Sequence, residues 1–175
     1  MKNGLIHIYC GDGKGKTTAA VGLSVRCAGG GGKVLFFQFM KGNGSGERES
    51  LKQLKNIDLI DGYENLKFVW NMTDSEKAKT AEYYTDKFKG IIKKACDENY
   101  DLIIMDEIIS AVNCEFVPLD TLTDFLKNKP QSLEVVITGR DPHKELIEIA
   151  DYVSEIKKIK HPFDKGIKAR KLIER

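Results

Sequence analysis

The residues best suited to chemistry lie near the start of the chain, in a segment rich in glycine and lysine. Glycines let successive backbone N–H groups turn toward one centre, and a helix beginning there adds the positive end of its dipole. Proteins cradle phosphate oxygens in this way. Lys16 can then reach the phosphates, and the Thr17 hydroxyl can ligate Mg²⁺. Cys10 stands where the usual pattern has its first glycine, so later glycines must supply the flexibility. We predict a loop that binds the triphosphate of ATP, formed by Gly11, Asp12, Gly13, Lys14, Gly15, Lys16, Thr17 and Thr18.

Two adjacent carboxylates form the second chemical feature. Asp106 and Glu107 follow the apolar segment 102–105. Phosphate-loop enzymes hold a metal ion with an acid at the end of a second parallel strand, and this pair has that position. The spacing leaves open which carboxylate contacts the metal, and a solvated strand end is the alternative without a function. Glu107 could also orient a water or an acceptor hydroxyl, so the pair fits a P-loop ATPase or a small-molecule kinase as readily as a transferase.

Strands and helices must bring these residues together, and hydrophobic patterning predicts them. We expect strands over 5–10, 33–39, 101–107 and 133–139, with further ones at 66–70 and 153–159. We expect helices over 16–28, 73–99, 118–130 and 142–150, and a mobile loop over 41–50; Thr73 and Glu76 fit a capping box. Apolar strands alternating with helices predict an α/β fold of the P-loop NTPase kind, with a mostly parallel central sheet and helices on both faces.

Composition is that of one ordinary globular domain. The chain has 175 residues, 41% hydrophobic and 31% charged, so we predict a single P-loop nucleotide-binding domain over 1–175 with a basic tail at 157–175. A net charge of +2 gives no strong attraction to nucleic acid, and no apolar run approaches the roughly 20 residues that span a membrane. The four cysteines form no CxxC pair, which favours a reducing, cytoplasmic location, and the three histidines suggest no triad or metal cluster.

Several segments taken together resemble one known family. They are the loop GDGKGKTTAAVG at 11–22, FQFMKG at 37–42 with GER at 46–48, MDE at 105–107, TGR at 138–140 and KHPFDKGIKAR at 160–170. From about residue 5 to residue 169 the chain closely resembles the corrinoid adenosyltransferases that have a phosphate-loop fold.

The resemblance implies a reaction and its participants. The 5′-deoxyadenosyl group of ATP would pass to the Co(I) of a reduced corrinoid, cob(I)alamin or cob(I)yrinic acid a,c-diamide, giving adenosylcobalamin or a precursor and triphosphate. Cobalt is the nucleophile, so the protein needs none of its own. Catalysis would consist of positioning and of stabilising the leaving triphosphate through Lys16, Thr17 and Glu107. The resemblance also implies Mg²⁺ or Mn²⁺, a homodimer, and a separate reductant such as a flavoprotein.

Individual site residues follow from the family's motifs. Thr17 and Glu107 would ligate the metal, with Asp106 supporting them. Arg26 matches an arginine near the nucleotide. Arg140 follows a strand end, where ligands of α/β sheets gather, and would contact the nucleotide or else pair with an acid such as Asp141.

Two further segments carry expectations from the same resemblance. Phe68 and Trp70 match an aromatic pair on the lower face of the corrin, where an apolar wedge would keep the lower base off cobalt and so ease its reduction. A buried strand is the alternative for these two residues. The basic tail at 157–175 would either close the site or contact a second subunit, in place of an ordinary solvated surface.

Overall fold

One parallel sheet organises the molecule. The computed structural model describes residues 3–64 and 66–174; Met1, Lys2, Asn65 and Arg175, which include both ends of the expected domain, lie outside the described residues. Within the described part the strands lie in the order β3-β2-β4-β5-β1-β6, and every adjacent pair is parallel. The strands are β1 (Ile6–Cys10), β2 (Val34–Gln38), β3 (Ile57–Leu59), β4 (Leu102–Asp106), β5 (Glu134–Thr138) and β6 (Tyr152–Glu155). The predicted α/β fold with a parallel sheet is confirmed.

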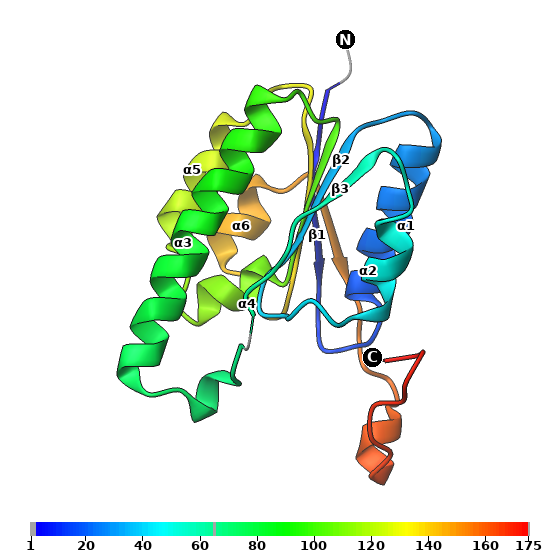
Figure 1. Ribbon diagram of the computed structural model, residues 1–175, viewed down its shortest axis with the longest axis vertical. Helices are drawn as coiled ribbons and strands as arrows, with labels where there is room; N and C mark the ends of the chain where they lie inside the picture. The colour runs from blue at the N-terminus through cyan, green and yellow to red at the C-terminus, as the bar shows by residue number, and fades with distance from the viewer. Residues whose placement is uncertain (1–2, 65, 175) are drawn as a thin grey trace.

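Helices cover both faces of this sheet (Figure 1). On one face lie α1 (Lys16–Gly29) and α2 (Gly46–Leu51). On the other lie α3 (Asp74–Asp97), α4 (Ile108–Asn113), α5 (Leu119–Asn128) and α6 (Lys144–Ile149). Thr73 and Glu76 form the predicted capping box at the start of α3. No helix in the described residues is long and apolar enough to span a membrane.

The strand order decides which side chains can meet. β5 lies between β1 and β4, so the strand before the phosphate loop is not a direct neighbour of the strand that ends in Asp106. Tyr9 of β1 is level with Thr138 of β5, and Met105 of β4 is level with Ile137. All three strands therefore end at one edge, where the first turn of α1 also begins.

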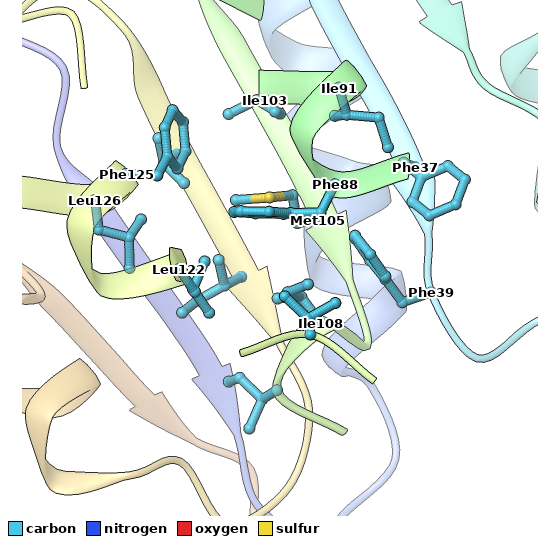
Figure 2. Close-up of a cluster of buried hydrophobic side chains, with 14 of the residues drawn as sticks. Phe37, Phe39, Phe88, Ile91, Ile103, Met105, Ile108, Leu122, Phe125 and Leu126 are labelled. Carbon is cyan, nitrogen blue, oxygen red and sulfur yellow. The ribbon is translucent and has the colours of Figure 1, made fainter. Parts of the chain in front are cut away.

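The core lies on both faces because the central strands are buried on both sides. β2 and β4 are buried at every residue, as their continuous apolar sequences predict. The larger apolar cluster includes Phe88 of α3, Phe125 of α5 and Met105 of β4, so these two helices pack on this face of the sheet (Figure 2). A smaller cluster joins Ala20 of α1 and Leu51 of α2 to the opposite face.

Some expectations about local structure were wrong. Residues 66–70 do not form a strand: a short 3₁₀ turn, η1 (Val69–Asn71), occupies the end of the segment, and β3 takes the edge beside β2. Residues 41–50, expected as a loop, contain the start of α2. β3 and α4 were missed. A three-residue strand is too short to show alternation, and α4 is so apolar that it has no visible helical period.

Candidate active site

A cavity of about 590 Å³ lies at the carboxyl-end edge of the sheet, and its size suits a nucleotide. Its wall includes residues 12–18 of the phosphate loop. Lys41, Glu47, Glu107 and Arg140 also line it, from the segments that follow β2, β4 and β5. Ligands of open α/β sheets bind at such an edge. The cavity therefore combines the loop and the acid that the sequence predicted would meet.

The glycines of the loop allow a close approach to the chain that follows β6. Gly11 has a φ of +99°, and a Cβ there would lie 2.5 Å from the carbonyl oxygen of Ile156. Gly13 donates its backbone N–H to that same oxygen at 2.7 Å. A side chain at either position would push the loop off the sheet edge, so the loop's shape depends on these two glycines.

Lys16 lies inside the loop. It is 7% exposed, and its Nζ donates to the carbonyl oxygens of Gly11 at 2.7 Å and Gly13 at 2.9 Å. Burial lowers the pKa of Lys16, an effect opposed by the negative charges of Glu107 and Asp106. The ammonium is thus held where phosphate oxygens would replace the two carbonyls as its partners.

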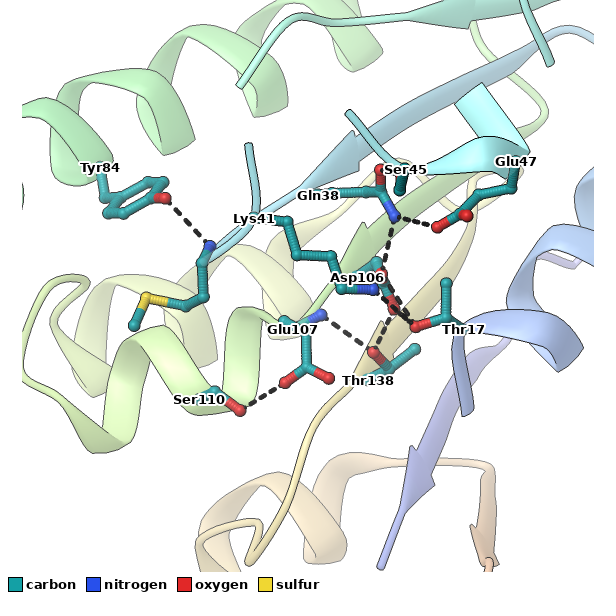
Figure 3. Close-up of polar contacts among 11 residues, drawn as sticks. Thr17, Gln38, Lys41, Ser45, Glu47, Tyr84, Asp106, Glu107, Ser110 and Thr138 are labelled. Atoms are coloured by element: carbon teal, nitrogen blue, oxygen red, sulfur yellow. Dashed lines mark hydrogen bonds and ion pairs between the residues drawn. The ribbon is translucent and has the colours of Figure 1, made fainter. Parts of the chain in front are cut away.

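Asp106 is the most heavily coordinated group of the site (Figure 3). It is fully buried and accepts hydrogen bonds from Thr17 Oγ1 at 3.0 Å, Thr138 Oγ1 at 2.7 Å and Gln38 Nε2 at 3.2 Å. The Nζ of Lys41 lies 2.8 Å from its Oδ2 and 2.9 Å from Thr17 Oγ1. These donors give partners to carboxylate oxygens that would otherwise be costly to bury.

Glu107 lies nearer the open cavity. It has a φ of +59° at the N-cap of α4, a strained conformation for a residue other than glycine. Its backbone N–H donates to Thr138 Oγ1 at 2.9 Å, and its Oε2 accepts from Ser110 Oγ at 2.6 Å. The strained turn makes its side chain part of the cavity wall while that of Asp106 stays below it.

The donor set suits a hard divalent cation. Thr17, Asp106 and Glu107 offer one hydroxyl and two carboxylates, the oxygen ligands that Mg²⁺ and Mn²⁺ take. No group of three or more His, Cys, Asp and Glu side chains suited to a metal occurs in the described residues. Mg²⁺ usually retains waters and takes phosphate oxygens as further ligands, so two carboxylates and a hydroxyl suffice.

The other predicted residues divide into two groups. Arg140 lines the cavity, and within the described chain it forms no ion pair with Asp141 or another acid. Arg26 is exposed in the last turn of α1 and is not part of the cavity wall. A helix rises 1.5 Å per residue, so Arg26 is displaced about 15 Å along α1 from Lys16. The structure does not bring Arg26 to the loop.

Phe68 and Trp70 also lie outside the cavity wall. They are 66% and 77% exposed, and their rings stack on each other with centroids 4.6 Å apart and planes at 11°. This rules out the alternative that they belong to a buried strand. A pair of large aromatic rings left in solvent is a surface of the kind that binds a partner.

The basic tail returns to the phosphate loop. It leaves β6 at the carboxyl-end edge, below the sheet in Figure 1, and passes through a 3₁₀ turn, η2 (Pro162–Lys165). Leu172, Ile173 and Glu174 then line the cavity, and Glu174 pairs with Lys14 at 3.1 Å. Asp12 accepts the backbone N–H of Lys158 at 2.9 Å, which lowers the pKa of Asp12.

Sequence reasoning did not assign four polar residues that touch the site, namely Gln38, Lys41, Glu47 and Thr138. Gln38 and Thr138 are fully buried polar residues at the ends of apolar strands. That position was a usable signal, because buried polar groups at a strand end need partners. Glu47 accepts from Gln38 Nε2 at 2.9 Å, which links α2 to the group around Asp106.

The loop, the acid two strands away and the intervening β5 define a P-loop nucleoside-triphosphate-binding protein. The fold is similar to that of a KaiC-like protein from Pyrococcus horikoshii OT3, with a TM-score of 0.52 at 19% identity, covering 89% of this chain and 73% of that one. The family model "ATP:corrinoid adenosyltransferase BtuR/CobO/CobP" matches residues 2–174, and the chain belongs to that family.

Named relatives agree with this assignment. The corrinoid adenosyltransferase of Escherichia coli strain K12 is 33% identical over 172 residues, which cover 97% of this chain and 84% of the relative. That of a Sinorhizobium species is 36% identical over 178 residues, which cover 99% of this chain and 81% of the relative. The protein is an ATP:corrinoid adenosyltransferase, a transferase whose substrates are ATP and a corrinoid.

Proposed function

We propose that ATP binds in the cavity with its triphosphate in the loop of residues 11–18, and that the Co(I) of a reduced corrinoid attacks its 5′ carbon. The new Co–C bond forms with the electron pair of cobalt, the C5′–O bond breaks, and its electrons leave with the triphosphate. The observation that carries this proposal is the gathering of Lys14, Lys16, Lys41 and Arg140 on one cavity. Four cations on one wall suit a polyphosphate leaving group.

The residues around Asp106 support a metal at this site. Thr17 and Glu107 would hold Mg²⁺ or Mn²⁺, and Asp106 would support them by fixing the Thr17 hydroxyl. When bound, the ion neutralises charge on the leaving triphosphate. Lys16 exchanges its carbonyl partners for phosphate oxygens, and Arg140 approaches the nucleotide from the end of β5.

Phe68 and Trp70 are proposed as the platform for the corrinoid. Their stacked, exposed rings offer an apolar surface against the lower face of the macrocycle. That surface would exclude the lower base and water from cobalt, so that a four-coordinate centre accepts the electron that makes Co(I). Lys67, next to Phe68, forms an ion pair with Glu76 in the first turn of α3. This contact links the segment that carries Phe68 and Trp70 to a long helix.

The setting of the reaction is proposed from the tail contacts and the cysteines, and, for the homodimer and the reductant, from the family resemblance. The tail closes the site, because residues 172–174 line the cavity and Glu174 pairs with the loop. The protein works in the cytoplasm, where the thiols of Cys10, Cys96 and Cys114 stay reduced. It acts as a homodimer and receives electrons from a separate reductant such as a flavoprotein.

An anaerobic assay tests the reaction. Purified protein with Mg-ATP and chemically reduced cob(I)alamin is followed by its visible spectrum, and the phosphate products are separated. We expect loss of the Co(I) band, growth of a light-sensitive alkylcobalamin spectrum, and one triphosphate per adenosyl group. ADP and phosphate without a spectral change would instead indicate a hydrolase or kinase in which Glu107 serves a water or a hydroxyl.

A further inference from the structure

Lys41 occupies an unusual position for a surface-loop lysine. Its Nζ lies between Asp106 Oδ2 at 2.8 Å and Thr17 Oγ1 at 2.9 Å (Figure 3). In the described residues it is the sole cation within ion-pair distance of Asp106, since Lys16 points to the loop carbonyls. The ammonium therefore neutralises a fully buried carboxylate, which would otherwise be strongly destabilising.

The same position is where the proposed metal would act. An ammonium and a divalent cation attached to one hydroxyl oxygen would lie a few ångström apart and repel each other. Thr17 and Asp106 can thus serve one cation at a time, and the presence of the ammonium shows that the site attracts positive charge.

The side chain of Lys41 can move while its backbone is held. Its side chain is 30% exposed, against none for Asp106, and it lines the same cavity as the phosphate loop and Arg140. Phe39 donates its N–H to the Asp106 carbonyl oxygen at 2.8 Å, and Met40 donates its N–H to Tyr84 Oη at 3.0 Å. The chain before Lys41 is therefore fixed, and a change of rotamer is the motion left to its ammonium.

We propose that Lys41 is a built-in counter-ion of Asp106 that the metal displaces, and that its ammonium then binds the triphosphate. This rests on the proposed metal and nucleotide sites. Lys41 would thereby keep the empty enzyme folded without a metal and add a fourth positive charge beside the leaving group once substrate is bound. Metal binding and triphosphate binding are coupled through this one side chain.

Removing the charge of Lys41 should have opposite effects on two ligands. Lys41→Met should bind Mn²⁺ alone, counted by electron paramagnetic resonance, about tenfold more tightly than the wild type, because a competing cation is gone. With Mn²⁺ saturating, the same variant should bind inorganic triphosphate about tenfold more weakly, because a cation has left the cavity. Lys52→Met, at the exposed C-cap of α2, loses the same charge and should match the wild type in both titrations.

Further variants separate the possible failures. In EDTA, Lys41→Met should melt below the wild type, and Mn²⁺ should raise its Tm more than that of the wild type. If the methionine variant does not fold, Lys41→Gln, which can still donate to Thr17 and Asp106, takes its place. Adding Asp106→Asn should abolish the gain in Mn²⁺ affinity.

Two outcomes would overturn the proposal. If Mn²⁺ affinity is unchanged or weakened in both Lys41 variants, the metal does not displace Lys41 from Asp106. If triphosphate affinity is unchanged, the Lys41 ammonium does not move to the triphosphate. If Thr17→Ala does not alter Mn²⁺ binding in the wild-type background, the proposed metal site itself is wrong, whatever Lys41 does.

Discussion

Thr138 donates a 2.7 Å hydrogen bond from its hydroxyl to the buried carboxylate of Asp106, and the same Oγ1 accepts the backbone N–H of Glu107. One residue at the end of β5 thus holds both members of the acidic pair at the end of β4. β5 supplies it because that strand lies between β4 and β1.

Replacing this hydroxyl should damage both stability and activity. Thr138→Val keeps the shape but leaves a buried carboxylate oxygen one donor short and the Glu107 N–H without a partner. We expect a loss of about 1–3 kcal/mol in the free energy of unfolding, measured with urea. We also expect a lower kcat. Thr138→Ser, which keeps the hydroxyl, should lose much less, and equal losses in the two variants would contradict this role.

Lys16→Ala should abolish the binding of ATP and therefore turnover. Its ammonium is buried at the centre of the loop, where no neighbouring lysine can replace it. Lys52→Ala is the matched control, since it removes the same charge from the exposed C-cap of α2, outside the cavity wall. Its affinity for ATP, measured by calorimetry, should fall only slightly. Similar losses in both variants would mean that net charge, and not position, accounts for nucleotide binding.

Trp70→Ala should separate ATP binding from cobalt chemistry. The ring is 77% exposed, so the free energy of unfolding should change by about 0.5 kcal/mol or less, and ATP binding should remain near normal. Cobalt reduction and adenosyl transfer to cobalamin should fall sharply. A corrinoid that has no lower base provides the control: the two rings then have only water to exclude, so the loss in Trp70→Ala should be smaller. Wild-type rates with complete cobalamin would show that Trp70 is not the platform.

The ion pair between Lys67 and Glu76, beside Phe68 and Trp70 in the sequence, predicts that the stability of the fold depends on pH. The hydrogen bond from Lys67, together with the Thr73 backbone N–H, lowers the pKa of Glu76 from 4.5 to about 2. The charged carboxylate is therefore favoured in the folded state. Its contribution is complete above the unfolded pKa of about 4.5 and is lost as pH falls toward 2. We expect the stability difference between the wild type and Glu76→Gln to be constant above about pH 6 and to shrink below pH 4.5. A difference that does not vary from pH 6 to pH 2 would contradict this.

A good part of the site was predictable from local chemistry. The loop at 11–18 can be recognised from sequence because phosphate binding needs glycines, a lysine and a hydroxyl close together in one turn. Asp106 was recognisable because a charged residue at the end of a strand buried on both faces needs polar partners or a ligand. The parallel sheet followed from the same apolar strands. All of these properties depend on residues close together in sequence.

Tertiary structure alone decided which distant residues share the site. Gln38, Lys41 and Thr138 meet at Asp106 because the order β1-β5-β4-β2 places their strand ends side by side, and no spacing in the sequence encodes that order. It also decided that Phe68 and Trp70 stay in solvent, since β3, and not the segment 66–70, forms the edge strand beside β2. Arg26 was placed away from the loop by the length of α1. Local chemistry specifies what a residue can do, whereas strand order and helix length specify what it can reach.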